Sequence, residues 1–268
     1  MSGGAVRGPA IRRLRAIHRK MSFAAFERLP HRIGWKHEYY GGKAHIRPAH
    51  LSVTLVLDLS PRTGRRRAGM RPIMPDDARA LAKPFLAAFA QAPEYVGYPA
   101  RVFRRKATEY FAGFFGEVRG KWSPASVVAE VSGEIIGAAL VKQREQGPLL
   151  DCLFVHPWHG RQGWAAALVT RVVRALLAEG ASKLESHVHL ANDASLAWHQ
   201  RFGFREVPDF WIASYRARFY AHELERRKDL SEAERAQLGQ LADYWWAETH
   251  RLDQWRCQEY ASAYPKAE

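Results

Sequence analysis

The sequence predicts an α/β protein with a central mixed sheet, flanking helices, an N-terminal hairpin extension and a C-terminal helical hairpin. Apolar and polar residues alternate along Leu51–Leu59, which is the pattern of a strand with one buried face. Leu149–His156 is almost continuously apolar, as in a strand buried on both faces. An amphipathic helical pattern follows at once over residues 163–179, and strands that pass directly into helices build α/β sheets.

Turn residues and periodicity place the other elements of this domain. Gly41-Gly42 and Ser132-Gly133 each separate two strand-like segments and so predict hairpins. Pro75-Asp76-Asp77 opens a helix, because proline and acidic residues are favourable in a first turn. The predicted elements are hairpins over 36–47 and 127–142, a strand over 70–74, a helix over 75–90, one or two helices within 94–122, a strand over 183–190, a helix over 192–202 and a strand over 204–207.

Basic and apolar residues recur at helical spacing near the N-terminus, which predicts a basic amphipathic helix over residues 11–21. Such a helix is either solvated or a tether to a membrane or to nucleic acid, and the solvated helix is the simpler interpretation. The residues concerned are Arg12, Arg13, Arg15, Arg19 and Lys20 on the basic side, and Ile11, Leu14, Ile17 and Met21 on the apolar side.

The C-terminal segment predicts two helices. The first covers Ala213–Lys228, and Ser231 with Glu234 forms a capping box for a second that runs to about residue 262. The second helix carries apolar residues at coiled-coil-like spacing: Leu238, Leu241, Trp245, Leu252 and Trp255. This seam packs either on the chain's own domain or on a second copy in a homodimer. The predicted organisation is an extension (1–50), an α/β domain (51–212) and a helical hairpin (213–268).

Composition limits the class of protein. Apolar residues make up 47% of the 268-residue chain and charged residues 25%, as in ordinary globular proteins. The two cysteines, Cys152 and Cys257, exclude a disulfide scaffold and a cysteine-rich zinc module, and they suit a reducing cytoplasm, where we expect the protein. No apolar run approaches the roughly 18 residues of a membrane helix, and no signal peptide is expected. The net charge of +14 attracts polyanions, either nucleic acid or a phosphate-bearing cofactor.

The most informative segment joins the strand 149–156 to the helix 163–179. Because the connecting loop is short, the unsatisfied N–H groups of the first helical turn point outward and can bind a pyrophosphate. Gly163 lets a phosphate approach the backbone, and Ala165 keeps the first turn uncrowded.

This segment resembles the acetyl-CoA motif of the GNAT superfamily of N-acetyltransferases, in which a valine two residues before proline is followed by Gln/Arg-x-x-Gly-x-Gly/Ala. Val155 and Pro157 match the strand end, and Gly163 and Ala165 match the last two positions. Gly160 departs from the usual Gln/Arg, for which Arg161 or Gln162 is expected to compensate. The resemblance implies that acetyl-CoA is bound by Phe154, Val155, Gly160, Arg161, Gln162, Gly163, Trp164, Ala165 and Asn192.

A second match follows, because Asn192 precedes a helix that ends in Gly203-Phe204. It resembles the family's other signature, an asparagine before a helix ending in Tyr-x-x-x-Gly-Phe. The resemblance implies that Asn192 contacts the pantetheine arm and that His199, at the tyrosine position, protonates the departing CoA thiolate. A thiolate with a pKa of about 8.5 accepts a proton readily from an imidazolium. The alternative is that His199 is only a residue of the helix surface.

The resemblance also implies the reaction. GNAT folds separate two central strands, the acyl-pantetheine enters the gap, and the amide of Val155 would polarise the thioester carbonyl. The acetyl group then passes directly to an amine in a ternary complex. Asp151 lies four residues before Val155, near where the family often carries an acidic base. A structural hydrogen bond explains this aspartate equally well.

The acceptor is expected to be a small-molecule or peptide amine that binds to residues 91–122 and to the C-terminal helices. Aromatic residues there either line a pocket or belong to the core. They are Tyr95, Tyr98, Phe103, Tyr110, Phe111, Phe114, Phe115 and Trp122.

No metal, membrane partner or nucleic-acid partner is expected. His156 with His159, and His187 with His189, have suggestive spacings but no obvious third ligand. The alternative function is a catalytically inactive GNAT-like module that senses acyl-CoA or binds nucleic acid.

Overall fold

The computed structural model describes residues 16–62, 67–117 and 120–263, with side chains up to residue 256. Its centre is an eight-stranded mixed sheet in which β9 and β10 are parallel and the other paired strands are antiparallel. In spatial order the strands are β11 (Arg205–Val207), β4 (Ser52–Asp58), β10 (Lys183–His189), β9 (Gly147–Val155), β8 (Glu134–Arg144), β7 (Val127–Val131) and β5 (Met70–Pro72), with β6 (Lys121–Trp122) beside β8.

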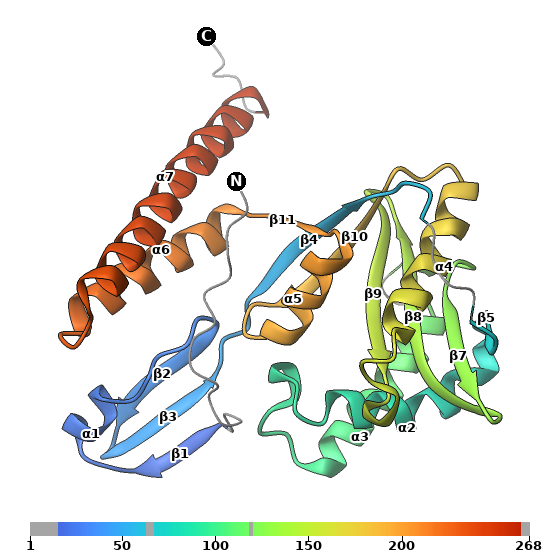
Figure 1. Cartoon of the computed structure of the whole chain (residues 1–268), viewed down its shortest axis with the longest axis horizontal. Helices are drawn as coiled ribbons and strands as arrows, with labels where there is room; N and C mark the ends of the chain where they lie inside the picture. Colours follow the sequence, from blue (N-terminus) through green and yellow to red (C-terminus); the bar gives the residue numbers. More distant parts are fainter. Residues whose placement is uncertain (1–15, 63–66, 118–119, 264–268) are drawn as a thin grey trace.

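Helices cover both faces of this sheet (Figure 1). On one face, α2 (Ala78–Phe89) and α3 (Ala100–Phe115) pack an aromatic core around Phe85, Phe111 and Phe114. On the other face, α4 (Trp164–Ala178) buries Leu168, Val172 and Leu176. Each such side chain stabilises the folded state by about 1.5–3 kcal/mol when it is fully buried. Successive residues of β8 alternate between the two cores, as expected for a sheet buried on both faces.

The predicted α/β fold class is confirmed, and most elements lie where the sequence places them. The helix expected from Pro75 begins as a 3-10 turn, η1 (Pro75–Asp77), because the Asp77 carboxylate accepts the Met74 N–H at 2.8 Å. Residues 94–122 contribute the short η2 (Pro93–Tyr95) and α3. The segment before the last strand is α5 (Asp193–Phe202).

The predicted helix over residues 11–21 is wrong where the structure describes it. Ile17–Lys20 is strand β1, which pairs antiparallel with β3 (Lys43–Pro48), and β2 (Trp35–Tyr40) pairs with the other edge of β3. The expected hairpin is therefore part of a three-stranded sheet, and the short helix α1 (Phe23–Glu27) lies between β1 and β2 in the chain. The free edge of β3 offers these residues a ladder of hydrogen bonds that sequence periodicity does not reveal. Arg12, Arg13 and Arg15 lie outside the described residues.

This N-terminal sheet is fixed to the domain at Gly34. A Cβ atom there would lie 2.6 Å from the backbone nitrogen of Ala191, and the φ of Gly34 is +77°. The Gly34 N–H also donates to the Tyr215 hydroxyl at 3.0 Å. Only glycine permits both this approach and this conformation at low cost.

The C-terminal hairpin consists of α6 (Phe210–Arg226) and α7 (Glu232–Ala263). The capping box is present, since the Glu234 carboxylate accepts the Ser231 N–H at 3.0 Å. Within the seam, Trp245 lies 4.3 Å from the guanidinium of Arg216 on α6, so this part of the seam packs on its own chain. Trp255 is 58% exposed, and a homodimer through α7 stays a prediction, as does the division into segments 1–50, 51–212 and 213–268.

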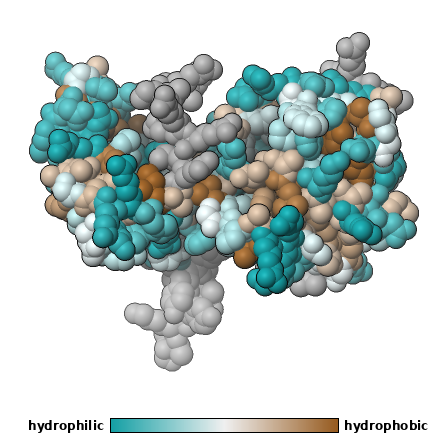
Figure 2. Space-filling model, turned by 90° about the horizontal axis from the view of Figure 1, so that it is seen from below, coloured by the Kyte–Doolittle hydropathy of each residue, from teal (hydrophilic) through white to brown (hydrophobic). Residues whose placement is uncertain are grey.

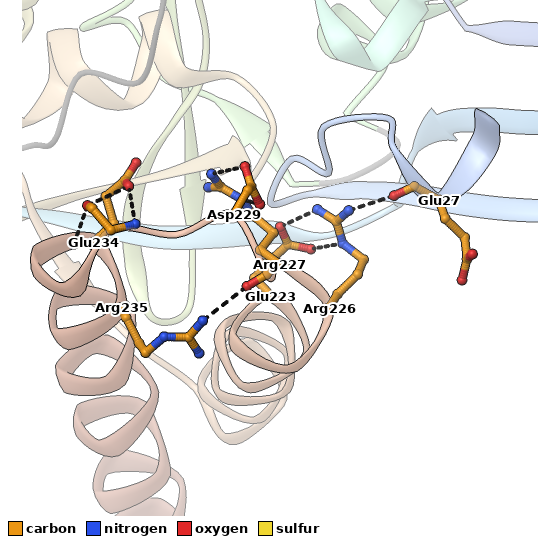
Figure 3. A network of polar contacts seen from close by, with 8 residues as sticks. Glu27, Glu223, Arg226, Arg227, Asp229, Glu234 and Arg235 are labelled. Carbon is orange, nitrogen blue, oxygen red and sulfur yellow. Dashed lines mark hydrogen bonds and ion pairs between the residues drawn. The ribbon is translucent and has the colours of Figure 1, made fainter. Parts of the chain in front are cut away.

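Polar contacts join α6 to the N-terminal extension (Figure 3). The Arg226 guanidinium donates to both carboxylate oxygens of Glu223, at 3.0 and 2.7 Å, and to the carbonyl oxygen of Glu27 at 2.8 Å. His31 Nδ1 lies 3.1 Å from the same carboxylate. Burial alone would raise the pKa of Glu223, but hydrogen bonds from His31 and Arg226 lower it to about 2.

Figure 2 views the molecule from below, where hydrophobic residues appear in several groups among hydrophilic ones, as on most protein surfaces. Among the helices of the described chain, none combines the length and the apolarity needed to cross a membrane.

Glu223→Gln is expected to lower the free energy of unfolding at pH 7 by about 2–3 kcal/mol, because it removes one partner of a buried ion pair. Since the pKa of Glu223 is about 2 in the folded state and 4.5 as a free side chain, its contribution is complete above pH 4.5 and is lost as the pH falls toward 2. Urea unfolding at pH 7, 4 and 3 measures this. The exposed Glu225→Gln on the same helix serves as control. If the loss in free energy of unfolding caused by Glu223→Gln were the same at all three pH values, the lowered pKa of Glu223 would be contradicted.

Candidate functional site

The two parallel strands of the sheet separate along their length. β9 and β10 pair only at Leu149 with Glu185 and at Leu150 with Ser186. Beyond these pairs lies a gap, here called the split. The N–H of His156 donates to the Ile136 carbonyl on β8 at 2.6 Å, so the backbone groups of the preceding residue, Val155, face the split instead. The edge of β9 therefore presents backbone groups that no described strand satisfies.

The loop after β9 ends in the first turn of α4. It contains the 3-10 turn η3 (Pro157–His159), then Arg161 with a φ of +57° and Gly163 with a φ of +82°. Gly163 is the N-cap and provides no side chain, so the first amides of α4 remain available to a ligand. This helix start, here called the anion site, follows the end of β9 and has the free N–H groups by which helix starts bind anions.

One basic and one aromatic side chain, Arg67 and Trp164, lie beside this anion site. The Arg67 guanidinium lies 4.5 Å from the ring of Trp164 and donates to the carbonyl oxygen of Gln162. Arg67 is the last residue of an arginine run at positions 65–67 of the sequence. The structure thus brings Gly160, Arg161, Gln162, Gly163, Trp164 and Ala165 together around one helix start.

A cavity of about 200 Å³ occupies the split. It is lined by β9, by β10 and by the start of α5, and the η2 turn closes it. Its polar lining comprises Glu94, Tyr95, Tyr110, Asp151, Ser186, His187, His189, Asn192, Ser195 and His199. Asp151 on β9, and Asn192 and His199 at the start and within α5, come from two separate segments and share one cavity.

His199 is 4% exposed, and both ring nitrogens have partners. Nδ1 lies 2.8 Å from the Ser195 carbonyl oxygen, to which only a protonated nitrogen can bond, and Nε2 lies 3.2 Å from the Ser186 hydroxyl. Burial lowers the pKa of His199, so the neutral imidazole predominates at neutral pH. His199 is thus buried in the split rather than on the helix surface.

Asp151 accepts a hydrogen bond of 2.5 Å from the Tyr110 hydroxyl on α3. Burial raises the pKa of Tyr110 well above its ordinary value, which keeps this hydroxyl protonated as a donor. The carboxylate is therefore oriented by one phenol and faces the cavity with its remaining acceptor capacity.

Asn192 has two structural contacts. Its Oδ1 accepts the Ser195 N–H at 3.1 Å and caps α5, while its Nδ2 donates to Glu94 at 3.2 Å. The sequence analysis missed Glu94, because the contact joins residues 98 positions apart and η2 is too short to show periodicity. An acidic residue beside a proline turn was the only local signal.

Phe154 differs from the other predicted cofactor residues. Its side chain is 3% exposed within the core under α2 and α3, and its backbone pairs with Ala138 on β8. The Phe154 side chain therefore packs in the core between β9 and the helices α2 and α3.

One group of described side chains has the proximity that a metal ion needs, namely His31, His222 and Glu223. Its carboxylate is already bound by Arg226 at 2.7 Å, and a guanidinium repels a cation. Neither histidine pair noted in the sequence belongs to this group.

Comparison with known proteins agrees with this geometry. Residues 87–204 match the model of the acetyltransferase (GNAT) family, which covers the split, the loop and α5 but less than half of the chain. This segment is therefore similar to the acetyltransferase domains of the GNAT family.

Solved GNAT structures with low sequence identity resemble the chain. A GCN5-related N-acetyltransferase from Sphaerobacter thermophilus is 22% identical over 58% of this chain and 48% of its own, with a TM-score of 0.44, so the match spans about half of that protein. A PaiA N-acetyltransferase from Thermoplasma acidophilum, solved with coenzyme A, is 16% identical over 52% of this chain and 90% of its own, with a TM-score of 0.44. The ribosomal-protein-S18-alanine N-acetyltransferase from Escherichia coli is 20% identical over 52% of this chain and 78% of its own, with a TM-score of 0.42.

Gly163→Ala is expected to destabilise the α/β domain by about 1–2 kcal/mol, because a side chain at positive φ is strained. Gly239→Ala in the regular helix α7 is the matched control and should stabilise by up to about 1 kcal/mol. Denaturant unfolding of both variants measures the difference. Equal effects of the two substitutions would contradict the left-handed cap.

Proposed function

We propose that the protein is an acetyl-CoA-dependent N-acetyltransferase. The observation that carries this proposal is the unpaired edge of β9, which runs along the split toward the free amides at the start of α4. An extended ligand arm with an anionic end needs both features side by side.

The cofactor residues take roles that follow from their positions. The amides from Gly163 to Ala165 bind the pyrophosphate, with Gly160 in the turn and Arg161 and Gln162 beside it. The pantetheine arm lies along β9 as an added strand and reaches Asn192. The Val155 N–H donates to the thioester carbonyl oxygen and stabilises the negative charge that develops there.

The transfer is a direct displacement. The acceptor ammonium first gives one proton to Asp151, which releases it to solvent. The neutral amine then attacks the thioester carbon, the nitrogen gives its second proton to the regenerated Asp151 carboxylate, and the amide bond forms as the carbon–sulfur bond breaks. His199 gives its proton to the departing sulfur. The lowered pKa makes the His199 imidazolium a stronger but scarcer acid at neutral pH.

An acyl-CoA sensor or nucleic-acid-binding module is the second candidate, favoured by the neutral state of His199 and by the net charge of +14. Thiol release from acetyl-CoA with a panel of amines separates the two. Turnover that depends on the amine supports the enzyme, whereas tight CoA binding without turnover by any amine supports the sensor. Cytoplasmic location stays a prediction.

Acetyl-CoA is expected to stabilise the fold by about 2.7 kcal/mol when its concentration is a hundred times Kd, which thermal unfolding detects. Gly163→Glu adds bulk and negative charge at the anion site and should abolish this shift, with native far-UV circular dichroism. The control Gly239→Glu adds the same side chain to α7, away from this site, and should leave the acetyl-CoA-induced shift unchanged. No shift for the wild type with millimolar acetyl-CoA at low salt would end the proposal.

His199→Phe is expected to lower kcat by about 10²-fold or more with little change in CoA affinity, since the proton is needed only as sulfur departs. His199→Tyr should restore much of the rate. For an acid with a lowered pKa, kcat should rise as the pH falls below 6.5. A kcat that instead falls with pH over this range would assign His199 as the base toward the amine.

A further inference from the structure

A larger cavity adjoins the split on the side of the N-terminal sheet. It has a volume of about 670 Å³ and lies between β2, the η2 turn and the start of α5. Tyr95 and Asn192 line both this chamber and the split cavity, so the two share a wall at these residues. A third cavity of about 250 Å³ shares Glu94 and His189 with the split, and Val96 and Tyr98 with the chamber.

We infer that this chamber binds the acceptor, and that the acceptor is a small organic cation with a primary amine. The inference rests on the proposed transferase function, whose attacking amine must reach the split. The chamber adjoins the split on the side of α5 and η2, whereas the anion site at α4 lies at the end of the β9 edge. Its volume falls within the range of small-molecule pockets, about 300–1,000 Å³.

The charges around the cavities favour a cation. Three carboxylates line them, namely Glu94 at the junction, Asp151 in the split and Asp193 in the chamber. This local excess of acid stands out in a chain of net charge +14. Both arginines of the lining are paired, Arg32 with Asp193 at 2.5 Å and Arg47 with Glu38 at 3.2 Å. Among the described lining residues, Glu94 and Asp151 therefore remain as the carboxylates outside these ion pairs.

The aromatic walls of the chamber already receive cations from the protein itself. The Lys106 ammonium lies 5.0 Å from the ring centroid of Tyr98, and the Arg32 guanidinium lies 5.9 Å from that of Trp35. Ring faces attract ammonium groups at such distances. Tyr95 lies in the same short turn as Glu94, and Tyr98 follows three residues later, so one segment supplies both aromatic rings and a carboxylate next to the split.

The N-terminal sheet therefore completes the acceptor site. Trp35 is 5% exposed, and Gly34 beside it fixes the sheet against Ala191 through the close approach described above. Glu94 holds the incoming ammonium, and its contact with the Asn192 amide orients the carboxylate. The proton released before attack passes to Asp151, and Glu94 acts in recognition.

The test compares steady-state kinetics with 1,5-diaminopentane, alanine and a neutral tetrapeptide as acceptors. Wild type should prefer the diamine. Glu94→Gln keeps an acceptor for the Asn192 amide but removes the charge, and it should raise KM for the diamine about 10-fold or more, with KM for acetyl-CoA unchanged. Tyr98→Leu, at a 39% exposed position, should raise KM for the diamine about 3-fold or more. Glu134→Gln, which removes a charge at the exposed turn between β7 and β8, should leave both KM values unchanged.

Calorimetric binding of 1,5-diaminopentane gives a readout that does not depend on turnover. Binding that Glu94→Gln weakens, in a protein that shows no transfer, would support the chamber while the transferase proposal fails. Transfer with an unchanged diamine KM in Glu94→Gln would overturn the chamber while the transferase stands. Equal or better use of alanine or the tetrapeptide would overturn the assigned class of acceptor.

Discussion

Two residue pairs between β9 and β10 are the constraint on which the functional site depends. While the strands are paired, their backbone groups are satisfied by each other; once they separate, the β9 edge at Val155 lies open. Buried backbone groups need partners, so an open edge inside a domain is unfavourable unless a ligand or water binds there. The same strand then leads directly into the anion site of α4. The split and the helix start therefore act as one extended site because a single strand connects them.

Burial determines the chemistry inside the split. It raises the pKa of Tyr110, so the phenol stays a donor to Asp151, and it lowers the pKa of His199, so the imidazole stays neutral at rest. The Asp151 carboxylate accepts the hydrogen bond of this phenol and keeps its remaining acceptor capacity toward the cavity. The cavity thus favours proton transfer from a cationic group toward Asp151, in line with the acidic lining of the neighbouring chamber.

The N-terminal extension is part of this arrangement rather than an appendage. Gly34 packs against the backbone of Ala191, one residue before Asn192, and Arg32 pairs with Asp193. The sheet β1–β3 therefore contacts the segment that begins α5 and carries His199. At its other side, Arg226 and Glu223 connect α1 and His31 to the C-terminal hairpin. The N-terminal sheet thus connects the start of α5 to the C-terminal hairpin.

The sequence by itself determined the α/β class, the strand–loop–helix unit of β9 and α4, and the capping box of α7, because each depends on neighbours within a few residues. It also placed Gly163, Asn192 and His199 in their local settings. Tertiary structure decided the rest. β1 is a strand because the edge of β3 lies beside it, against its helical periodicity. His199 is buried because α5 packs against β10 at the split, and Glu94 meets Asn192 because the η2 turn lies beside the start of α5. The β1–β3 pairing joins residues more than 20 positions apart, and the Glu94–Asn192 contact joins residues 98 positions apart. The burial of His199 depends on desolvation, and none of these features leaves a pattern in local sequence.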